Sequence, residues 1–338
     1  SLIDCGLFQG HKELRELNWR EPPFEPSSIE RVLLTHAHID HIGALPRLVK
    51  QGFRGPILCT AATKQLARLL LLDSAKLQEE DARYANRKGF SKHKPALPLY
   101  DEGDAKRALK QFEKIERGAW VDFPRGLRVR WQAAGHILGS ASLEVRVPKP
   151  GKGREESTIV FSGDVGRYDM PLHIDPLPMP PCDVLVCEST YGDRLHDVGV
   201  AIEEQLREAV LPTLERGGIV LMPAFAVGRS QMLTLILRQL MNDGQLPGVP
   251  VHIDSPMAVD ATRIYSEFLD EHHLDAEIFA DGRRTLFPND VHLERSTAQS
   301  KALNELPGPR IIISASGMLS GGRVLHHLAR LVTDRENV

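Results

Sequence analysis

The segment Thr35-His-Ala-His-Ile-Asp-His41, which follows an apolar run, constrains this chain more than any other feature of its sequence. In an extended segment, side chains two positions apart point the same way, so His36 and His38 can converge on one cation. Asp40 and His41 come where the chain turns into a predicted helix, so their side chains can reach a second cation. Imidazole and carboxylate groups suit zinc and similar borderline ions. A chance cluster of surface histidines is the alternative, and the regular spacing makes it the weaker one.

Two later residues extend this set. His136 lies in a glycine-flanked loop between two predicted strands, residues 127–132 and 142–147. Asp164 directly follows another predicted strand, and a carboxylate at a strand end is well placed to bridge two metals. Alone, either residue is more typical of a turn or a cap, but beside the first motif both are predicted ligands. Asp4, at the end of the first apolar run, is predicted to orient a ligand histidine and not to bind metal itself.

Strand and helix patterns change in character near residues 192–197. Before this point short strand-like runs predominate, and after it strand–helix pairs repeat, as in a parallel sheet with crossover helices. We therefore expect a layered α/β protein with one domain over residues 1–193 and a second over residues 194–338. Apolar residues at helical spacing also predict a helix over residues 105–117.

Charge and composition narrow the classes of function. The net charge of −3 gives no overall basic field, so nucleic-acid contacts must come from local positive surface. Residues 83–94 carry five basic and no acidic side chains, and such a run is more often a solvated loop than a contact for an anionic ligand. No apolar run approaches the ~18 residues that span a bilayer. Four dispersed cysteines without a C-x-x-C pair favour reduced thiols in a cytoplasmic protein.

The ordered set of metal-binding candidates resembles the first four motifs of the metallo-β-lactamase superfamily. The resemblance implies an αββα sandwich with two zinc ions. One zinc would be held by His36, His38 and His136, the other by Asp40 and His41, with Asp164 as the bridge and Asp4 behind the ligands. It also implies a metal-bound hydroxide as the nucleophile, and manganese or iron could take the place of zinc.

Later stretches resemble the β-CASP branch of that superfamily, which includes the cleavage and polyadenylation endonuclease and RNase J. The stretches are Cys187-Glu-Ser-Thr-Tyr-Gly192, Met222-Pro-Ala-Phe-Ala-Val-Gly-Arg-Ser-Gln231, His252-Ile-Asp-Ser-Pro-Met257 and Ile313-Ser-Ala-Ser-Gly-Met-Leu-Ser-Gly-Gly-Arg323. The branch implies an inserted parallel α/β domain and RNA processing. By this resemblance Asp40, Asp164 and Glu188 are the expected catalytic residues.

The chain departs from the family pattern at both ends, which look cut from a longer protein. The family's last two histidine motifs lie beyond the stretch that ends at Arg323, and its first lactamase strands precede Ser1. One of those histidines completes the second zinc site, and the other pairs with the residue at the position of Glu188. The resemblance therefore implies a second site that is one ligand short within residues 1–338, and it leaves open whether these residues are active alone.

Two glycine-bearing loops are candidates for holding a nucleic-acid backbone. Arg229 begins a predicted helix after an apolar strand, where helix-start amides can bind phosphate. Ser316, Gly317 and Arg323 lie in a loop of the same layout. For both loops, a structural role with the arginine in an ion pair is equally compatible with the sequence.

Together these features favour a zinc-dependent phosphodiesterase that acts on single-stranded RNA in a groove between its two domains. A DNA nuclease is one rival activity. A hydrolase of small esters, thioesters or lactams is another, and the region after Tyr191 counts against it. The rival of another class is a non-catalytic scaffold subunit of an RNA-processing complex, but such members typically lose zinc ligands. The sequence does not indicate oligomeric state, sequence specificity, or endo- versus exonucleolytic cleavage.

Overall fold

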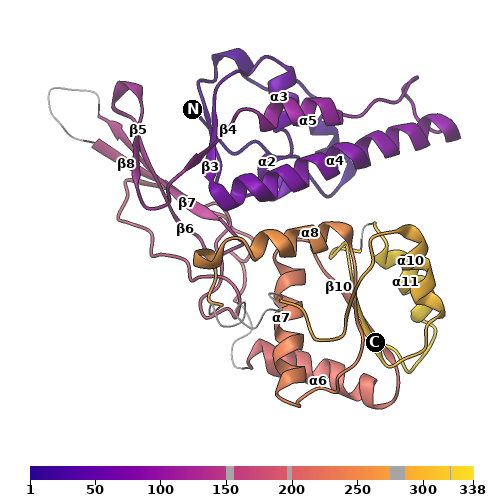
Figure 1. Ribbon diagram of the computed structural model, residues 1–338. Coiled ribbons are helices and arrows are strands. Elements are labelled where there is room, and N and C mark those ends of the chain that lie inside the picture. Colours follow the sequence, from indigo (N-terminus) through magenta and orange to yellow (C-terminus); the bar gives the residue numbers. More distant parts are fainter. Residues whose placement is uncertain (150–155, 196–199, 275–285, 320) are drawn as a thin grey trace. The chain divides into compact units, whose positions relative to one another are not determined.

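The computed structural model describes residues 1–149, 156–195, 200–274, 286–319 and 321–338, and these residues form two compact units (Figure 1). The first unit comprises Ser1–Tyr168 and Asp175–Glu188, and the second comprises Asp169–Ile174 and Ser189–Val338. The short segment Asp169–Ile174, which the sequence placed within the first domain, is therefore part of the second unit.

The first unit contains a parallel sheet and a mixed sheet that face each other. The parallel sheet has the order β1-β2-β3-β4, with bounds β1 Leu2–Ile3, β2 Val32–Leu33, β3 Ile57–Thr60 and β4 Phe112–Ile115. The mixed sheet has the order β5-β6-β7-β8-β9, with bounds β5 Trp120–Asp122, β6 Arg128–Ala133, β7 Ala141–Pro148, β8 Glu156–Phe161 and β9 Val184–Val186. Strands β5 to β8 are antiparallel, and β9 runs parallel to β8.

The core of the first unit lies between these sheets. Alternate residues of β6 are buried, as expected for a strand with one face on a core, and they include Val129 and Trp131. These side chains pack against Leu33 and Leu58 of the parallel sheet. The Trp131 Nε1–H group also donates a hydrogen bond of 3.0 Å to the carbonyl of Leu34, so the indole joins the two sheets at the strand that leads into the histidine motif.

Helices cover the other face of the parallel sheet (Figure 1). The helices of the first unit are α1 Lys12–Leu17, α2 Ile39–Ile42, α3 Leu45–Lys50, α4 Ala61–Lys88 and α5 Glu102–Leu109, with 3-10 turns at Pro26–Ser28 and Pro124–Gly126, and α1 buries none of its residues. Helix α4 begins after Thr60, whose side chain accepts a hydrogen bond from the amide of Thr63, and it ends at Gly89 in a left-handed conformation. Because α4 continues to Lys88, only the second half of the basic run at residues 83–94 is a loop.

The predicted helix over residues 105–117 is wrong in its second half. Helix α5 ends at Leu109, and Phe112–Ile115 is strand β4, which pairs in parallel with β3. Phe112 is buried in this pairing. The apolar spacing fits a helix, but tertiary pairing with β3 overrides that local preference.

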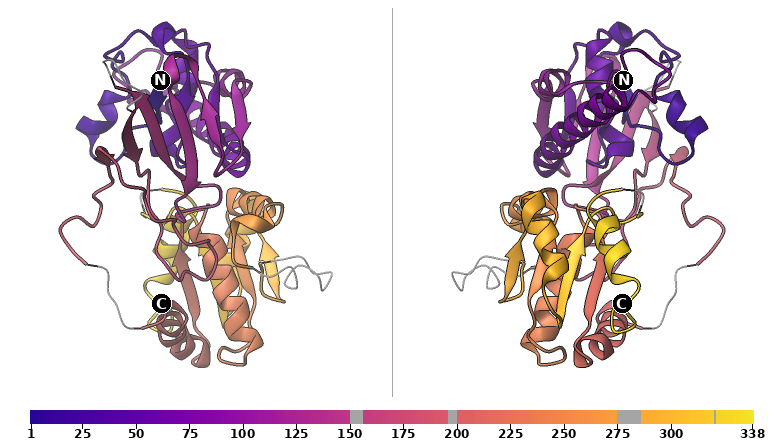
Figure 2. Two further views of the ribbon diagram at one scale, coloured as in Figure 1. Left: turned by 90° about the vertical axis from the view of Figure 1, so that its left-hand side faces the viewer. Right: turned by 90° about the vertical axis from the view of Figure 1, so that its right-hand side faces the viewer.

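The second unit is built around a parallel sheet of order β10-β13-β11-β12 (Figure 2). Its strands are β10 Ile219–Pro223, β11 Val251–Asp254, β12 Val291–Leu293 and β13 Arg310–Ser314. Its helices are α6 Ile202–Glu215, α7 Arg229–Asn242, α8 Pro256–Tyr265, α10 Thr297–Ala302 and α11 Val324–Leu331, with 3-10 turns at Leu269–Glu271 and Leu303–Glu305. Ile311 and Ile313 pack in the cluster with α6 and α7, whereas Ile312 packs with Leu303 and Leu331. Both sheet faces are thus covered, as a parallel sheet requires.

Candidate metal centre

Four side chains from three loops converge at one end of the sheets of the first unit. They are His36 and His38 after β2, His136 between β6 and β7, and Asp164 after β8, and one ligand atom of each lies within 4.8 Å of the others. In the part of the chain that the structure describes, no other group of three or more His, Cys, Asp or Glu side chains brings its ligand atoms this close together. The first histidine motif, the later loop and the strand-end carboxylate therefore meet at a single point.

The spacing of these donor atoms suits a tetrahedral cation. Ligand bonds of about 2.0–2.1 Å in that geometry place donor atoms about 3.3 Å apart. His38 Nδ1 lies 3.1 Å from His36 Nε2 and 3.1 Å from His136 Nε2. Asp164 Oδ2 lies 3.3 Å from His136 Nε2 and 3.6 Å from His36 Nε2. Three imidazoles and one carboxylate are also a donor set that zinc and related ions accept, so the residues fit a divalent metal.

A second, more open group adjoins the first through Asp164. The other oxygen of this carboxylate, Oδ1, lies 3.2 Å from His41 Nε2. Asp40 Oδ2 lies 4.0 Å from the same nitrogen, and the Asp40 side chain is exposed. Both residues lie in the short helix α2, so the helix directs them away from His36 and His38. Asp164 is consequently the carboxylate that can face two cations at once.

Asp4 holds the back of this arrangement. It follows β1 with a φ of 52°, which turns its carboxylate under the histidine motif. The backbone N–H and the hydroxyl of Thr35 donate to it at 2.8 and 2.7 Å, and His41 Nδ1 lies 2.7 Å from it. The Thr35 oxygen also lies 3.0 Å from His36 Nδ1. Thr35 and Asp4 therefore hold the rings of His36 and His41 through Nδ1, so that Nε2 of each ring lies toward Asp164.

Tight loops position the other two converging side chains, His136 and Asp164. The Ser140 hydroxyl oxygen accepts hydrogen bonds from the amides of His136 and Ile137, which closes the loop that carries His136. Gly163, directly before Asp164, has a φ of +56°, and a Cβ atom there would lie 2.7 Å from Cβ of Thr35. Only glycine fits this position without displacing Thr35. The sequence predicted His36 and His136 as candidate ligands, but no local pattern predicted that Thr35 and Ser140 hold them in place.

Burial and neighbouring charge set the pKa values of these groups in the absence of a cation. Burial lowers the pKa of His36 well below its usual range, and the imidazoles of His38, His41 and His136 lower it further. Burial alone would lower the pKa of His41, but hydrogen bonds to Asp164 and Asp4 raise it to about 10. Burial acts to raise the pKa of Asp164, yet the hydrogen bond from His41 lowers it below its usual value. The centre is thus a site of strongly perturbed groups, as is typical of functional sites.

Glu188 lies beside this centre and is half-buried. It follows β9, and its backbone amide donates to the Ser162 hydroxyl oxygen at 3.0 Å. Its Oε1 accepts a hydrogen bond of 2.8 Å from the amide of Val165, which follows Asp164. Its negative charge also acts to raise the pKa of His136, although burial keeps that pKa below its usual value. Glu188 is therefore hydrogen-bonded to the loop that carries Asp164.

The two glycine-bearing loops of the second unit lie side by side at the ends of β10 and β13. A Cβ atom on Gly317 would lie 2.9 Å from the backbone nitrogen of Phe225, so the loops are in direct contact. Arg229 begins α7 with an exposed side chain, and the Ser316 hydroxyl accepts from the amide of Met318 at 3.3 Å. Arg323 instead donates to Asp254 Oδ1 at 2.6 Å and to the carbonyls of Glu294 and Arg295, each at 2.9 Å. Arg323 therefore forms the structural ion pair that the sequence left open as the alternative to a phosphate contact.

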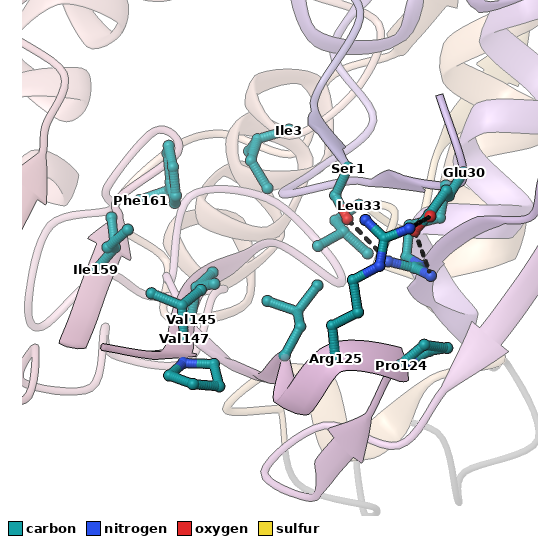
Figure 3. A pocket seen from close by; sticks show the side chains of 13 residues that line it. Ser1, Ile3, Glu30, Leu33, Pro124, Arg125, Val145, Val147, Ile159 and Phe161 are labelled. Atoms are coloured by element: carbon teal, nitrogen blue, oxygen red, sulfur yellow. Dashed lines mark hydrogen bonds and ion pairs between the residues drawn. The ribbon is translucent and has the colours of Figure 1, made fainter. Parts of the chain in front are cut away.

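A separate pocket of about 400 Å³ lies at another edge of the first unit (Figure 3). Its lining is mainly apolar and includes Ile3, Leu33 and Phe161. Arg31, which also lines the pocket, donates a hydrogen bond of 3.1 Å to the Ser1 hydroxyl and pairs with Glu30 at 3.0 Å. None of the converging metal-centre residues lines this pocket, and its apolar walls do not suit a polyanion.

Two protein-family models match the chain. Residues 2–121 match the metallo-beta-lactamase superfamily, and residues 230–338 match the Beta-Casp domain. The first match includes Asp4 and the motif that ends at His41. No helix among the described residues has the length and apolar character needed to cross a membrane.

Curated relatives match along nearly the whole chain. Ribonuclease TTHA0252 of Thermus thermophilus is 35% identical over 99% of this chain and 72% of its own length. Transcription termination factor FttA is 31% identical in Methanosarcina mazei and 32% identical in Methanothermobacter thermautotrophicus, in each case over 99% of this chain. The chain spans 51% of each of these archaeal relatives.

Proposed function

Because the chain belongs to the metallo-β-lactamase superfamily and carries its Beta-Casp domain, we propose that it is a metal-dependent ribonuclease that cleaves phosphodiester bonds in single-stranded RNA. The observation that carries this proposal is the convergence of three imidazoles and one carboxylate with tetrahedral spacing. The name of the bacterial relative, a ribonuclease, supports RNA as the substrate.

We assign two zinc ions to the centre, with manganese or iron as chemically acceptable substitutes. The first would be held by His36, His38, His136 and Asp164, and the second by Asp40, His41 and the other oxygen of Asp164. When bound, such a pair supplies Lewis acidity that lowers the pKa of water and stabilises negative charge on a phosphoryl group.

The chain's own residues contribute orientation and proton handling. Asp4 and Thr35 fix the rings of His41 and His36, so their ligand nitrogens need little reorganisation before they bind a cation. Asp164 keeps its two oxygens directed at the two groups of donors. Glu188, hydrogen-bonded to the same loop, is the carboxylate that we assign to holding and transferring a proton. Of the four predicted substrate contacts, Arg229, Ser316 and Gly317 remain proposed contacts for the RNA backbone.

Three rivals predict different results in one experiment. A DNA nuclease would cleave single-stranded DNA in preference to RNA, and a small-molecule hydrolase would cleave esters or thioesters but neither nucleic acid. A scaffold subunit would cleave nothing and would hold no stoichiometric metal. The filled set of ligand positions disfavours the scaffold.

The test is cleavage of matched single-stranded RNA and DNA by the full-length protein, with His38→Ala and a chelator as controls. We expect RNA cleavage that both controls abolish, because His38 Nδ1 lies 3.1 Å from two other ligand nitrogens. Cleavage of neither strand by protein that holds its metal would reject the nuclease and redirect the search to small esters.

A further inference from the structure

The C-terminal end of α4 carries positive charge far from the metal centre. We call residues 83–97, which form the last turns of α4 and the following loop, the α4 tip. Its first twelve residues, 83–94, contain five Lys or Arg and no Asp or Glu. In Figure 1 the end of α4 extends beyond α5 and away from the two sheets of its unit. The chain as a whole has a net charge of −3, so this positive charge is a local feature.

Two aromatic rings are exposed among these cations. The side chain of Tyr84 is 49% exposed and that of Phe90 is 66% exposed. Their ring centroids lie 6.0 Å apart, and the Arg87 guanidinium lies 5.5 Å from the centre of the Tyr84 ring. Exposed rings interleaved with cations are the arrangement on which bases of a single strand can stack.

Intramolecular ion pairs leave most of this charge uncompensated. Arg83 pairs with Glu79 at 3.7 Å. No carboxylate among the described residues lies within 4.0 Å of the ammonium groups of Lys88, Lys92 or Lys94. The helix dipole accounts for Lys88, which lies in the last turn of α4. It accounts neither for the lysines in the following loop nor for the exposed rings.

The loop of the α4 tip is held in shape before any ligand arrives. Asn86 in α4 and Ala96 in the loop exchange two hydrogen bonds, of 2.9 and 2.7 Å. Further along, the amide of Leu99 donates to Gln78 at 3.1 Å. Because these contacts fix the loop against α4, binding would cost less conformational entropy than it would for a free loop.

From charge complementarity and the exposed rings, we propose that the α4 tip is an auxiliary binding surface for single-stranded RNA, a role that rests on the proposed ribonuclease function. Lys88, Lys92 and Lys94 would contact phosphates, and Tyr84 and Phe90 would stack on bases. Helix α4 begins beside the metal centre, where Thr60 and Thr63 both donate to the carbonyl of Gly139. At 1.5 Å per residue, its 28 residues place the tip about 40 Å along the helix. Only a long RNA could reach both places.

The test measures the affinity of a fluorescent oligouridylate for three variants of the full protein. Removing the three lysines (Lys88→Gln, Lys92→Gln, Lys94→Gln) should weaken binding about tenfold and reduce the salt slope of log K by about 2, or ~0.7 for each phosphate contact. The double variant Tyr84→Ala, Phe90→Ala should weaken binding at least about 30-fold with an unchanged salt slope, because it removes two stacking rings. The control, Lys110→Gln with Lys114→Gln, removes exposed lysines elsewhere in the same unit and should change neither quantity.

Cleavage assays separate this inference from the proposed function. We expect the α4-tip variants to cleave a ~5-nucleotide RNA, which is too short to reach the tip, at the wild-type rate, and to lose efficiency only on RNA several times longer. Wild-type affinity in both tip variants would overturn the inference and leave the ribonuclease intact. Absence of RNA cleavage by the wild type would reject the proposed ribonuclease, whereas loss of oligouridylate binding in the tip variants would still support the surface.

Discussion

Asp4 lies outside the candidate ligand set but is hydrogen-bonded to it. Its carboxylate receives two hydrogen bonds from Thr35 and lies 2.7 Å from His41 Nδ1. We expect Asp4→Asn to weaken metal binding about 10- to 100-fold, because the amide cannot hold the His41 ring as the carboxylate does. Competition with a chelator measures this affinity. Asp122→Asn, the same change at an exposed strand-end aspartate, is the matched control, and equal metal affinity in the two variants would contradict the orienting role.

A substitution at Gly163 would show how tightly the loop that carries Asp164 is packed. Gly163→Ala introduces a Cβ atom 2.7 Å from Thr35 Cβ at a φ of +56°, whereas Gly118→Ala has a similar positive φ and nothing within 4 Å. The control should lose about 1 kcal/mol of unfolding free energy from backbone strain alone. Gly163→Ala should lose about 1–3 kcal/mol more from the clash. Denaturant titration gives both values, and equal losses would mean that the loop is not tightly packed.

The candidate ligands could be predicted from the sequence because the spacing of histidine and aspartate residues along a short segment indicates metal binding. His36, His38, Asp40 and His41 are neighbours in the chain, and glycine flanks His136. The contact between Asp4 and Thr35 joins residues 31 positions apart, and the hydroxyl of a threonine at a strand end carries no signal of its own. Residues that hold candidate ligands in place, such as Thr35, are thus harder to predict from sequence than the candidate ligands themselves.

In the second unit a buried acid, Asp254 of β11, forms contacts with α10 and α11. Asp254 Oδ2 accepts from Ser300 at 2.6 Å and lies 2.7 Å from His327 Nε2, while Oδ1 accepts from Arg323 at 2.6 Å. Burial alone would raise the pKa of Asp254, but these hydrogen bonds lower it below its usual value. An acid with a lowered pKa in the folded protein stabilises the fold above its unfolded pKa and loses this effect as the pH falls.

We therefore expect Asp254→Asn to lower the free energy of unfolding by about 3 kcal/mol at neutral pH, because it leaves buried partners without their counter-charge. The difference from wild type should hold down to about pH 5 and shrink below about pH 4, as the wild-type carboxyl is protonated on unfolding. Asp260→Asn removes a partly exposed ion pair with Arg295 and should cost less than about 1 kcal/mol. A difference that grows as the pH falls would contradict this account.

Strand β4 was predicted as part of a helix, because its local apolar pattern does not reveal its pairing with a distant strand. Residues 105–117 have apolar side chains at helical spacing, yet Phe112–Ile115 forms a strand. Its register, with Phe112 opposite Ile57 and Ile115 opposite Thr60, depends on β3, about fifty residues earlier in the chain. By contrast, helix α7 begins at Arg229, where the sequence predicted a helix start, because a short apolar strand and a glycine-bearing turn precede it.

At the scale of the whole molecule, the two units have separate cores. In the first unit, strand ends and tight loops bring the candidate metal ligands together, and in the second unit two loops pack against each other at the ends of β10 and β13. Composition and motif order predicted an α/β protein of two parts. The assignment of Asp169–Ile174 to the second unit could not be foreseen, since its bridge between His173 and His272 joins distant segments.

The most direct test of the account is the dependence of RNA cleavage on bound metal. The protein is stripped with a chelator and titrated with Zn²⁺ while elemental analysis follows bound metal and a labelled single-stranded RNA follows cleavage. We predict that cleavage is absent from the stripped wild type, returns as zinc binds, and does not return in His38→Ala, which should bind less metal. Undiminished RNA cleavage by the stripped protein, or by His38→Ala, would contradict the central claim that this cluster is the catalytic centre.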